Sequence, residues 1–148
     1  MLRQKELKDN YMEKRLIDSI YYYYEENTSY GLKILIKYQG VTKCLFFDSS
    51  KFVFLEEIEL SKNSNYNWRK INYEELKNQV HIVEIKEDEL VSYFIKLSNN
   101  DIFYIFQRID SLEKWEQDFE IINENSLRYS EVEEYMNESW IDQIELEN

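Results

Sequence analysis

Nine acidic side chains near the carboxyl end are the residues whose type and spacing best fit a chemical task. They form two runs in which neighbours lie three or four residues apart: Glu113, Glu116, Glu120 and Glu124, then Glu131, Glu134, Glu138, Asp142 and Glu145. On an α-helix this spacing puts carboxylates on one face, about 5–6 Å apart. Ionised carboxylates accept strong hydrogen bonds from lysine and arginine. The pattern therefore predicts binding to a cationic surface.

The overall charge distribution supports the same interpretation. Residues 101–148 hold 14 of the 30 acidic residues and 3 of the 18 basic ones, so this segment carries nearly all of the net charge of −12. Two such helices side by side would approach the charge spacing of duplex DNA, about one charge per 1.7 Å. The alternative is a solvated helix face that serves only solubility.

Residues suited to catalysis or metal binding are sparse. The single histidine, His81, lies in an apolar Val-His-Ile-Val stretch and is expected to be half-buried and hydrogen-bonded. The single cysteine, Cys44, lies in Lys-Cys-Leu-Phe-Phe and is expected in the core. One histidine and one cysteine supply neither a zinc site nor a nucleophilic triad. We expect no enzymatic activity, no cofactor and no metal. A hydrolase that uses paired carboxylates alone stays open as a further alternative.

A short basic and aromatic stretch offers a secondary contact. Trp68 and Arg69 follow Tyr66 and precede Lys70 in a polar segment, where they could stack on a partner. The net charge of −12 argues against direct nucleic-acid binding. We therefore interpret Trp68 and Arg69 as a protein contact or as packing onto the core.

The apolar periodicities predict an α+β fold in one domain, residues 1–148. We expect a mainly antiparallel sheet, or sheets, of about six strands in two three-stranded runs, with an N-terminal helix and two C-terminal amphipathic helices. The expected helices cover residues 3–24 and 72–78 and begin again at Asp110 and Ser130. The expected strands cover residues 32–38, 41–48, 52–60, 80–86, 90–97 and 102–107. Gly40 and Asn99-Asn100 are the turn signals between strands.

The termini and cysteine content predict a cytoplasmic protein. Residues 1–14 are rich in charge, unlike a secretory signal, and no apolar run is long enough to cross a membrane. A single cysteine allows no internal disulfide, which fits a reducing compartment.

A small, acidic, aromatic-rich domain without catalytic motifs resembles bacterial immunity proteins and phage-encoded inhibitors in composition. The leading hypothesis is an inhibitor whose acidic C-terminal helices bind and occlude a basic target, either a nuclease toxin or another nucleic-acid enzyme. Its role would be that of an immunity protein or an anti-defence protein, with DNA mimicry as a narrower form. The alternative is a non-catalytic interaction or scaffold module whose acidity serves only solubility. The sequence leaves the oligomeric state open.

Overall fold

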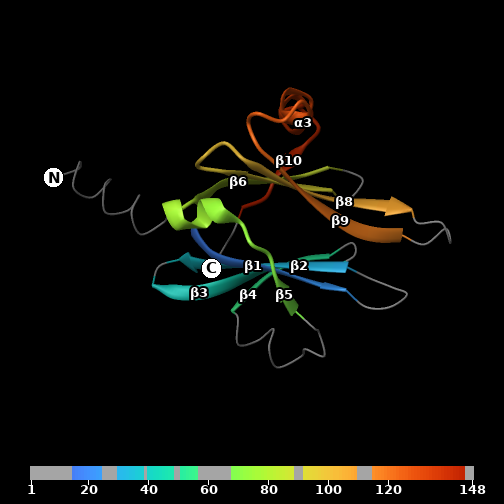
Figure 1. Ribbon diagram of the computed structural model, residues 1–148. Helices are drawn as coiled ribbons and strands as arrows, with labels where there is room; N and C mark the ends of the chain where they lie inside the picture. Colours follow the sequence, from blue (N-terminus) through green and yellow to red (C-terminus); the bar gives the residue numbers. More distant parts are fainter. Residues whose placement is uncertain are drawn as a thin grey trace.

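The computed structural model describes residues 15–24, 30–38, 40–48, 51–56, 68–88, 92–109 and 115–145. These residues form one antiparallel sheet that is folded into two layers (Figure 1). The strands of the first layer are β1 (Arg15–Tyr24), β2 (Tyr30–Tyr38), β3 (Val41–Asp48), β4 (Lys51–Glu56) and β5 (Trp68–Lys70). The strands of the second layer are β6 (His81–Glu87), β7 (Tyr93–Leu97), β8 (Ile102–Ile109), β9 (Trp115–Ile122) and β10 (Asp142–Gln143).

Strand β1 joins the two layers. The strand order is β4-β3-β2-β1-β6-β7-β8-β9, with β5 paired to β1 and β10 paired to β6. The first residues of β1 pair with β6, whereas Tyr21, Tyr22 and Tyr23 pair with β5. A register shift in β1 between Ile17 and Ser19 lies where the strand changes partner. Such a bulge bends a strand and increases its twist, so it helps one sheet to form both layers.

The chain leaves the sheet between β5 and β6 and returns to the same strand. The Ile71 N–H donates to Ile20 O at 2.8 Å, and the Ile17 N–H donates to Val80 O at 3.0 Å. Between these two points lies η1 (Glu74–Asn78), a 3-10 helix that projects at one end of the two layers (Figure 1).

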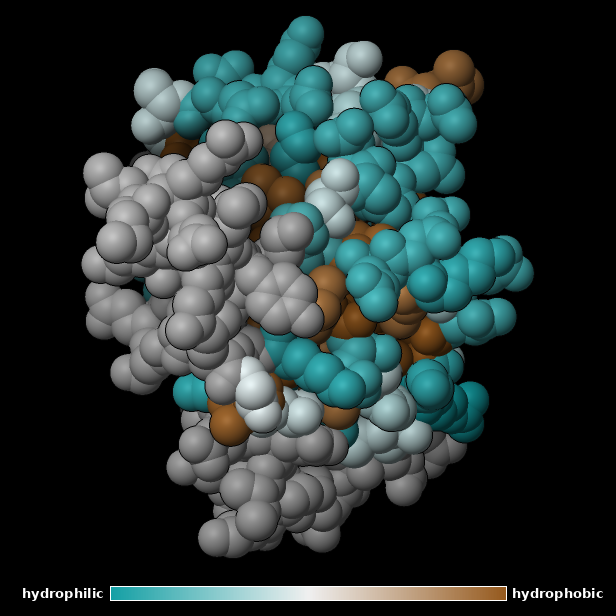
Figure 2. All heavy atoms as spheres, turned by 90° about the vertical axis from the view of Figure 1, so that its left-hand side faces the viewer, coloured by the Kyte–Doolittle hydropathy of each residue, from teal (hydrophilic) through white to brown (hydrophobic). Residues whose placement is uncertain are grey.

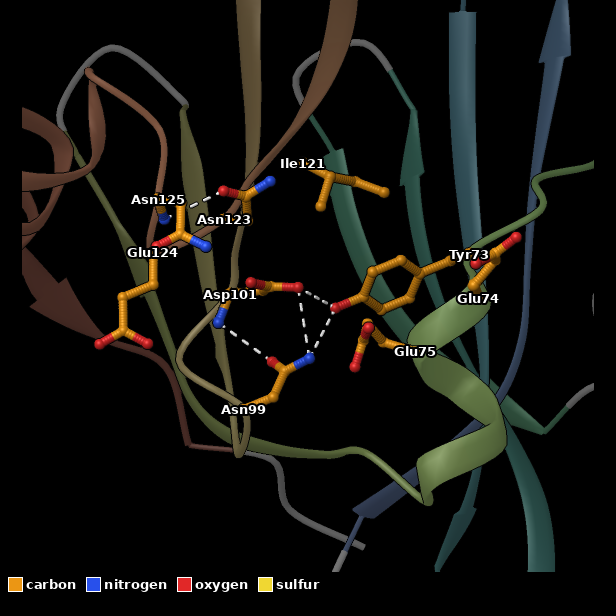
Figure 3. A pocket seen from close by; sticks show the side chains of 9 residues that line it. All are labelled: Tyr73, Glu74, Glu75, Asn99, Asp101, Ile121, Asn123, Glu124 and Asn125. Atoms are coloured by element: carbon orange, nitrogen blue, oxygen red, sulfur yellow. Dashed lines mark hydrogen bonds between the residues drawn. The ribbon is translucent and has the colours of Figure 1, made fainter.

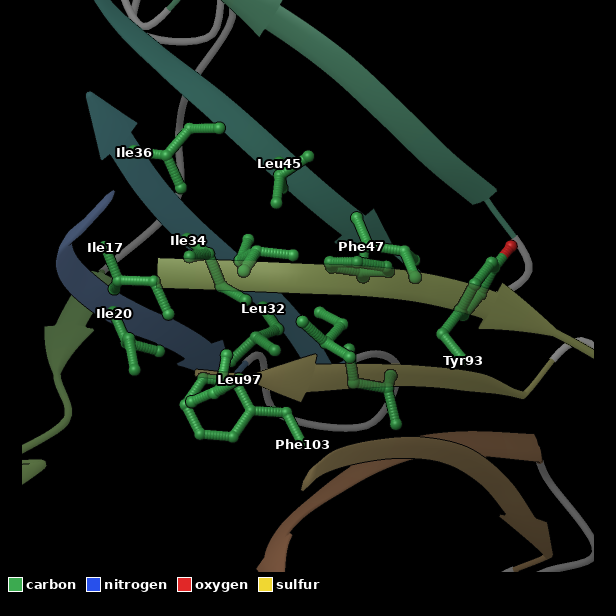
Figure 4. Close-up of a cluster of buried hydrophobic side chains, with 14 of the residues drawn as sticks. Ile17, Ile20, Leu32, Ile34, Ile36, Leu45, Phe47, Tyr93, Leu97 and Phe103 are labelled. Carbon is green, nitrogen blue, oxygen red and sulfur yellow. The ribbon is translucent and has the colours of Figure 1, made fainter. Parts of the chain in front are cut away.

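The main core fills the space between the layers. Alternate residues of β2 supply Leu32, Ile34 and Ile36, and the facing layer supplies residues such as Ile95 and Phe103 (Figure 4). All five are at most 2% exposed. Period-two alternation puts these side chains on one face of each strand, so burying that face fixes the strand register.

The α-helix α3 (Tyr129–Met136) covers the outer face of the second layer (Figure 1). Its buried residues Tyr129, Val132 and Met136 pack with Phe94 and Ile102 of the sheet. Polar contacts add to this packing. The Tyr135 hydroxyl donates to Asp88 Oδ2 at 2.9 Å, Lys86 Nζ to Asn137 Oδ1 at 2.9 Å, and Lys96 Nζ to Glu133 Oε2 at 3.3 Å.

The outer face of the first layer has its own small cluster, and no described helix lies on it. Leu35, Cys44 and Phe46 are buried there, with Tyr21 and Trp68 packed against them. Lys33 Nζ lies 4.8 Å from the centroid of the Tyr21 ring and 4.4 Å from that of the Trp68 ring. The lysine thus covers the aromatic pair by cation–π contact.

Strand β9 is one edge of the sheet. The Phe119 N–H in this strand donates to Asp118 Oδ1 at 2.8 Å. A side chain next to it in sequence therefore occupies this backbone donor.

The expected α+β fold is wrong in its helices and in its number of strands. The described part of the N-terminal helix, residues 15–24, is β1, and residues 3–14 lie outside the described residues. The helix expected from Asp110 is replaced by β9, which pairs with β8 from Ile102↔Ile122 to Ile109↔Trp115. The described residues contain one α-helix. Their sheet has ten strands, whereas about six strands in two runs were expected.

Several local predictions are confirmed. The expected strands at 41–48, 80–86 and 102–107 correspond to β3, β6 and β8, and those at 32–38 and 52–60 overlap β2 and β4. Gly40 and Asn100 have φ values of 80° and 74°, as the turns between strands require. The last expected helix exists as α3, but it begins at Tyr129 with Arg128 as N-cap, so Ser130 does not cap it.

Among the residues that the structure describes, no helix has the length and apolar character needed to cross a membrane.

Candidate functional site

The nine acidic residues predicted to line two helix faces lie in different settings. Glu113 is outside the described residues, and Glu116 is in β9, where only its backbone is described. Glu120 also lies in β9, and its Oε2 is 2.6 Å from Arg128 Nη1. The helical stripe of Glu113, Glu116, Glu120 and Glu124 is therefore wrong, because Glu116 and Glu120 belong to β9 and Glu124 to the turn that follows it.

The second run of acids lies in α3 and in the segment that follows it. Glu131 and Glu134 are exposed on α3, on the side opposite Val132 and Met136. Helix α3 ends at Met136, so Glu138, Asp142 and Glu145 continue beyond it, with Asp142 in β10. All three are exposed.

We call the exposed carboxylates around α3 the acidic surface: Glu124, Glu131, Glu134, Glu138, Asp142 and Glu145. The basic residues beside it already have polar partners, since Arg128 contacts Glu120, Lys96 contacts Glu133 and Lys86 contacts the Asn137 side chain. Among the described residues, no ion pair joins a lysine or arginine to any carboxylate of the acidic surface. Hydrophilic residues accordingly cover the upper part of the molecule in Figure 2, where α3 lies.

Two apolar side chains project near the acidic surface. Leu127, just before α3, is 103% exposed, and Trp140, just after it, is 42% exposed. The Trp140 ring packs edge-on against Tyr135, with 5.1 Å between ring centroids. An exposed leucine and a partly exposed tryptophan among carboxylates are the side-chain types that protein interfaces desolvate.

Tyrosines beneath the acidic surface are held in their neutral form. Burial, followed by the charge of Glu133, raises the pKa of Tyr129 to about 12. Burial, followed by the charges of Glu87 and Asp88, raises the pKa of Tyr93 to about 12. Burial, with a smaller contribution from the neighbouring carboxylates, therefore disfavours the charged form of both tyrosines.

The two residues of the predicted secondary contact differ in exposure, because Trp68 is half-buried and Arg69 is exposed. Trp68 is half-buried in β5 and packs edge-on against Phe46, with 5.9 Å between ring centroids. Arg69 beside it is exposed.

A pocket of about 550 Å³ opens at the end of the two layers (Figure 3), and we call it the end pocket. Its lining comes from residues 73–75 at η1, Asn99 and Asp101 of the β7–β8 turn, Ile121, and residues 123–125 after β9. Glu124 lines the end pocket and is also one of the carboxylates of the acidic surface.

A hydrogen-bond network forms one wall of the end pocket. The Tyr73 hydroxyl donates to Asp101 Oδ2, which also accepts from Asn99 Nδ2 at 3.3 Å. Asn99 Nδ2 donates to the Tyr73 oxygen at 2.9 Å, and Asn99 Oδ1 accepts from the Asp101 N–H at 3.0 Å. Burial raises the pKa of Tyr73 well above its usual range, so its hydroxyl stays a donor to Asp101.

The sequence did not reveal the end pocket. Asn99 was recognised only as a turn residue, and Tyr73, Asn99 and Asp101 meet only because η1 leaves the sheet and folds over its end. Among the described residues, no group of three or more histidine, cysteine, aspartate or glutamate side chains is placed to hold a metal ion.

No protein-family model matches the chain, and no significant similarity is found to curated proteins or to solved structures.

Proposed function

We propose that this protein is a non-catalytic inhibitor that binds and occludes a basic partner through the acidic surface around α3. The observation that carries the proposal is the set of six exposed carboxylates for which the described residues supply no ion-pair partner. Like charges left together repel one another, and a cationic partner would relieve that repulsion.

The proposed target is an enzyme that handles nucleic acid, such as a nuclease toxin. Lysines and arginines that hold phosphates also accept carboxylates, because both anions make charge-assisted hydrogen bonds. The protein would then act as an immunity protein or a phage anti-defence protein in the cytoplasm, a setting that suits a chain whose single cysteine, Cys44, is buried.

The proposal no longer includes a DNA-like array of charges. That idea required two helices with parallel stripes, and β9 takes the place of the first helix. Occlusion by one helix and its flanking turns needs no such regularity.

The test compares two exposed acids on opposite layers, each changed to lysine. Glu134→Lys alters the acidic surface and Asp18→Lys alters β1, with the same change in net charge. The partner is captured from source cells at about 50 mM salt, purified, and titrated with each variant by calorimetry.

We expect Glu134→Lys to weaken binding at least tenfold, which corresponds to about 1.4 kcal/mol, and Asp18→Lys to change it less than twofold. Wild-type affinity should also fall as salt rises, since screening shortens the range of the field. Equal effects of the two variants would refute the proposal.

A second candidate is an interaction module that binds through exposed apolar residues, with acidity only for solubility. Leu127 and Trp140 favour it. In that case Trp140→Ala would abolish binding, whereas salt and Glu134→Lys would have little effect.

A further inference from the structure

The end pocket is lined by groups that call for a cationic ligand. Four carboxylates line it, from Glu74, Glu75, Asp101 and Glu124, and its described lining includes no lysine, arginine or histidine. A volume of about 550 Å³ lies within the range of sites that take small molecules or single side chains.

Neutral acceptors in the pocket are already used. Asn99 Oδ1 accepts the Asp101 N–H at 3.0 Å, and Asn123 Oδ1 accepts the Asn125 N–H at 3.0 Å. The Tyr73 oxygen accepts from Asn99. With these three neutral oxygens engaged within the protein, the carboxylates are the strongest acceptors that the pocket offers a ligand.

Asp101 points to a ligand independently of the charge count. It is only 8% exposed, and both side-chain hydrogen bonds that it accepts fall on Oδ2. Oδ1 accepts none from the described residues and is not sealed from solvent, so it faces the pocket that Asp101 lines. Figure 3 shows this second oxygen turned away from Tyr73. Asp101 Oδ1 is therefore an accessible carboxylate oxygen to which a ligand in the pocket can donate.

The arrangement fits a broad cation better than a metal ion. The described residues provide no cluster of three metal-binding side chains, and the carboxylates come from three separate segments around the pocket. A guanidinium group is planar, permanently charged and carries five N–H donors, so it can reach several separated acceptors at once. The Tyr73 ring, which is held edge-on to Phe103 with 5.3 Å between centroids, adds an aromatic wall that a guanidinium can stack on.

We propose that the end pocket accepts the guanidinium group of an arginine presented by the basic partner, with Asp101 Oδ1 as its principal acceptor. This inference rests on the proposed function for the source of the arginine. Because Glu124 belongs to both regions, a partner that covers the acidic surface lies beside the pocket mouth. An arginine in such a pocket would anchor the interface.

The probe is N-acetyl-arginine methylamide, which has a guanidinium but no charged termini, titrated into ¹⁵N-labelled protein. The matched neutral probe is the citrulline analogue, which has nearly the same shape. We expect millimolar binding of the arginine probe, with shifts centred on the amides of Asn99, Asp101 and Asn123, and no comparable shifts with citrulline.

Variants locate the site. Asp101→Asn should weaken the arginine probe at least tenfold. Because Asp101 also supports Tyr73, Glu75→Gln and Glu124→Gln at the exposed mouth give a second measurement, each expected to weaken binding about threefold. Asp18→Asn makes the same charge change outside both the pocket and the acidic surface and should leave binding unchanged.

Equal shifts with both probes, shifts confined to α3, or insensitivity to the pocket variants would overturn the inference. The two proposals fail separately. If the probe misses the pocket while Glu134→Lys still weakens the partner, only the pocket assignment fails. If the probe binds as expected while Glu134→Lys has no effect, the inhibitor proposal fails.

Discussion

The two layers of the sheet differ in the charge that they carry and in the way that they cover their outer faces. Strands β1–β5 contain seven lysines and arginines and three acids, whereas strands β6–β10 contain three lysines and arginines and six acids. The first layer covers its outer aromatic rings with Lys33. The second layer covers its outer apolar cluster with α3, whose far side carries Glu131 and Glu134.

The two layers differ in whether their charged side chains contact groups of the same chain or remain exposed to solvent. In the first layer cations meet groups of the same chain, as Lys33 does with its two rings and as Lys37 Nζ does with Asp18 Oδ1 at 3.8 Å. Around α3 most carboxylates point into solvent. A molecule whose negative charge is concentrated on one side is oriented by a cationic partner before contact, which speeds association at low salt.

The largest expected effect on stability comes from weakening the packing of α3 on the outer face of the second layer. Met136 is fully buried between α3 and the sheet, so Met136→Ala should lower the free energy of unfolding by about 2–5 kcal/mol. Urea denaturation followed by circular dichroism measures the loss. Leu127→Ala nearby removes a fully exposed side chain and should change stability by less than about 0.5 kcal/mol. A loss below about 1 kcal/mol for Met136→Ala would mean that α3 does not depend on this cluster.

A smaller effect on stability is expected from Tyr129, whose pKa is raised, mainly by burial, to about 12 in the folded protein against 10.0 ordinarily. Between pH 10 and 12 the unfolded chain loses this phenolic proton while the folded protein keeps it. The stabilising contribution is therefore complete below pH 10 and is lost as the pH rises to 12.

Tyr129→Phe should flatten this alkaline decline by an amount on the order of 2 kcal/mol at pH 12. Urea midpoints measured at intervals from pH 9 to 12 give the slope for each protein. The variant also loses the hydrogen bond from Tyr129 Oη to Asn100 O, at 2.6 Å, so the slope, rather than the stability at one pH, is the readout. Parallel slopes for the two proteins would contradict the assignment.

The smallest expected effect on stability comes from Lys33, which lies over aromatic rings on the outer face of the first layer. Lys33→Gln keeps much of the side-chain length but removes the charge above Tyr21 and Trp68, and should cost about 0.5–1 kcal/mol. Chemical denaturation at low and high salt would show the loss in both conditions. Arg69→Gln removes a neighbouring exposed charge and should have almost no effect. Equal losses in these two variants would show that net charge, not the ring contact, matters.

Hairpin signals in the sequence were informative because they are local. Alternating residues with a glycine at a positive φ define β2 and β3, and Asn99-Asn100 marks the β7–β8 turn without help from distant residues. The acids of the final run also stay around the short helix α3, since Val132 and Met136 give it one apolar face.

The strands β1 and β9 were missed because both also fit a helical pattern. Trp115, Phe119 and Ile122 recur at helical spacing, yet Phe119 and Ile121 alternate along a strand and pack against the main core. Pairing with β8 decides between the two, and that is a property of the tertiary structure. The end pocket was beyond prediction for the same reason, since Tyr73 and Asp101 are brought together by the path of the whole sheet.

The side-chain hydrogen bond at the β9 edge has a consequence for the protein at high concentration. A strand at a sheet edge can template the addition of another chain through its unpaired backbone groups. Because Asp118 already holds the Phe119 N–H and carries a negative charge there, a second molecule would have to break that bond and approach a carboxylate to extend the sheet. The bond therefore makes the addition of another strand at this position of the edge less favourable.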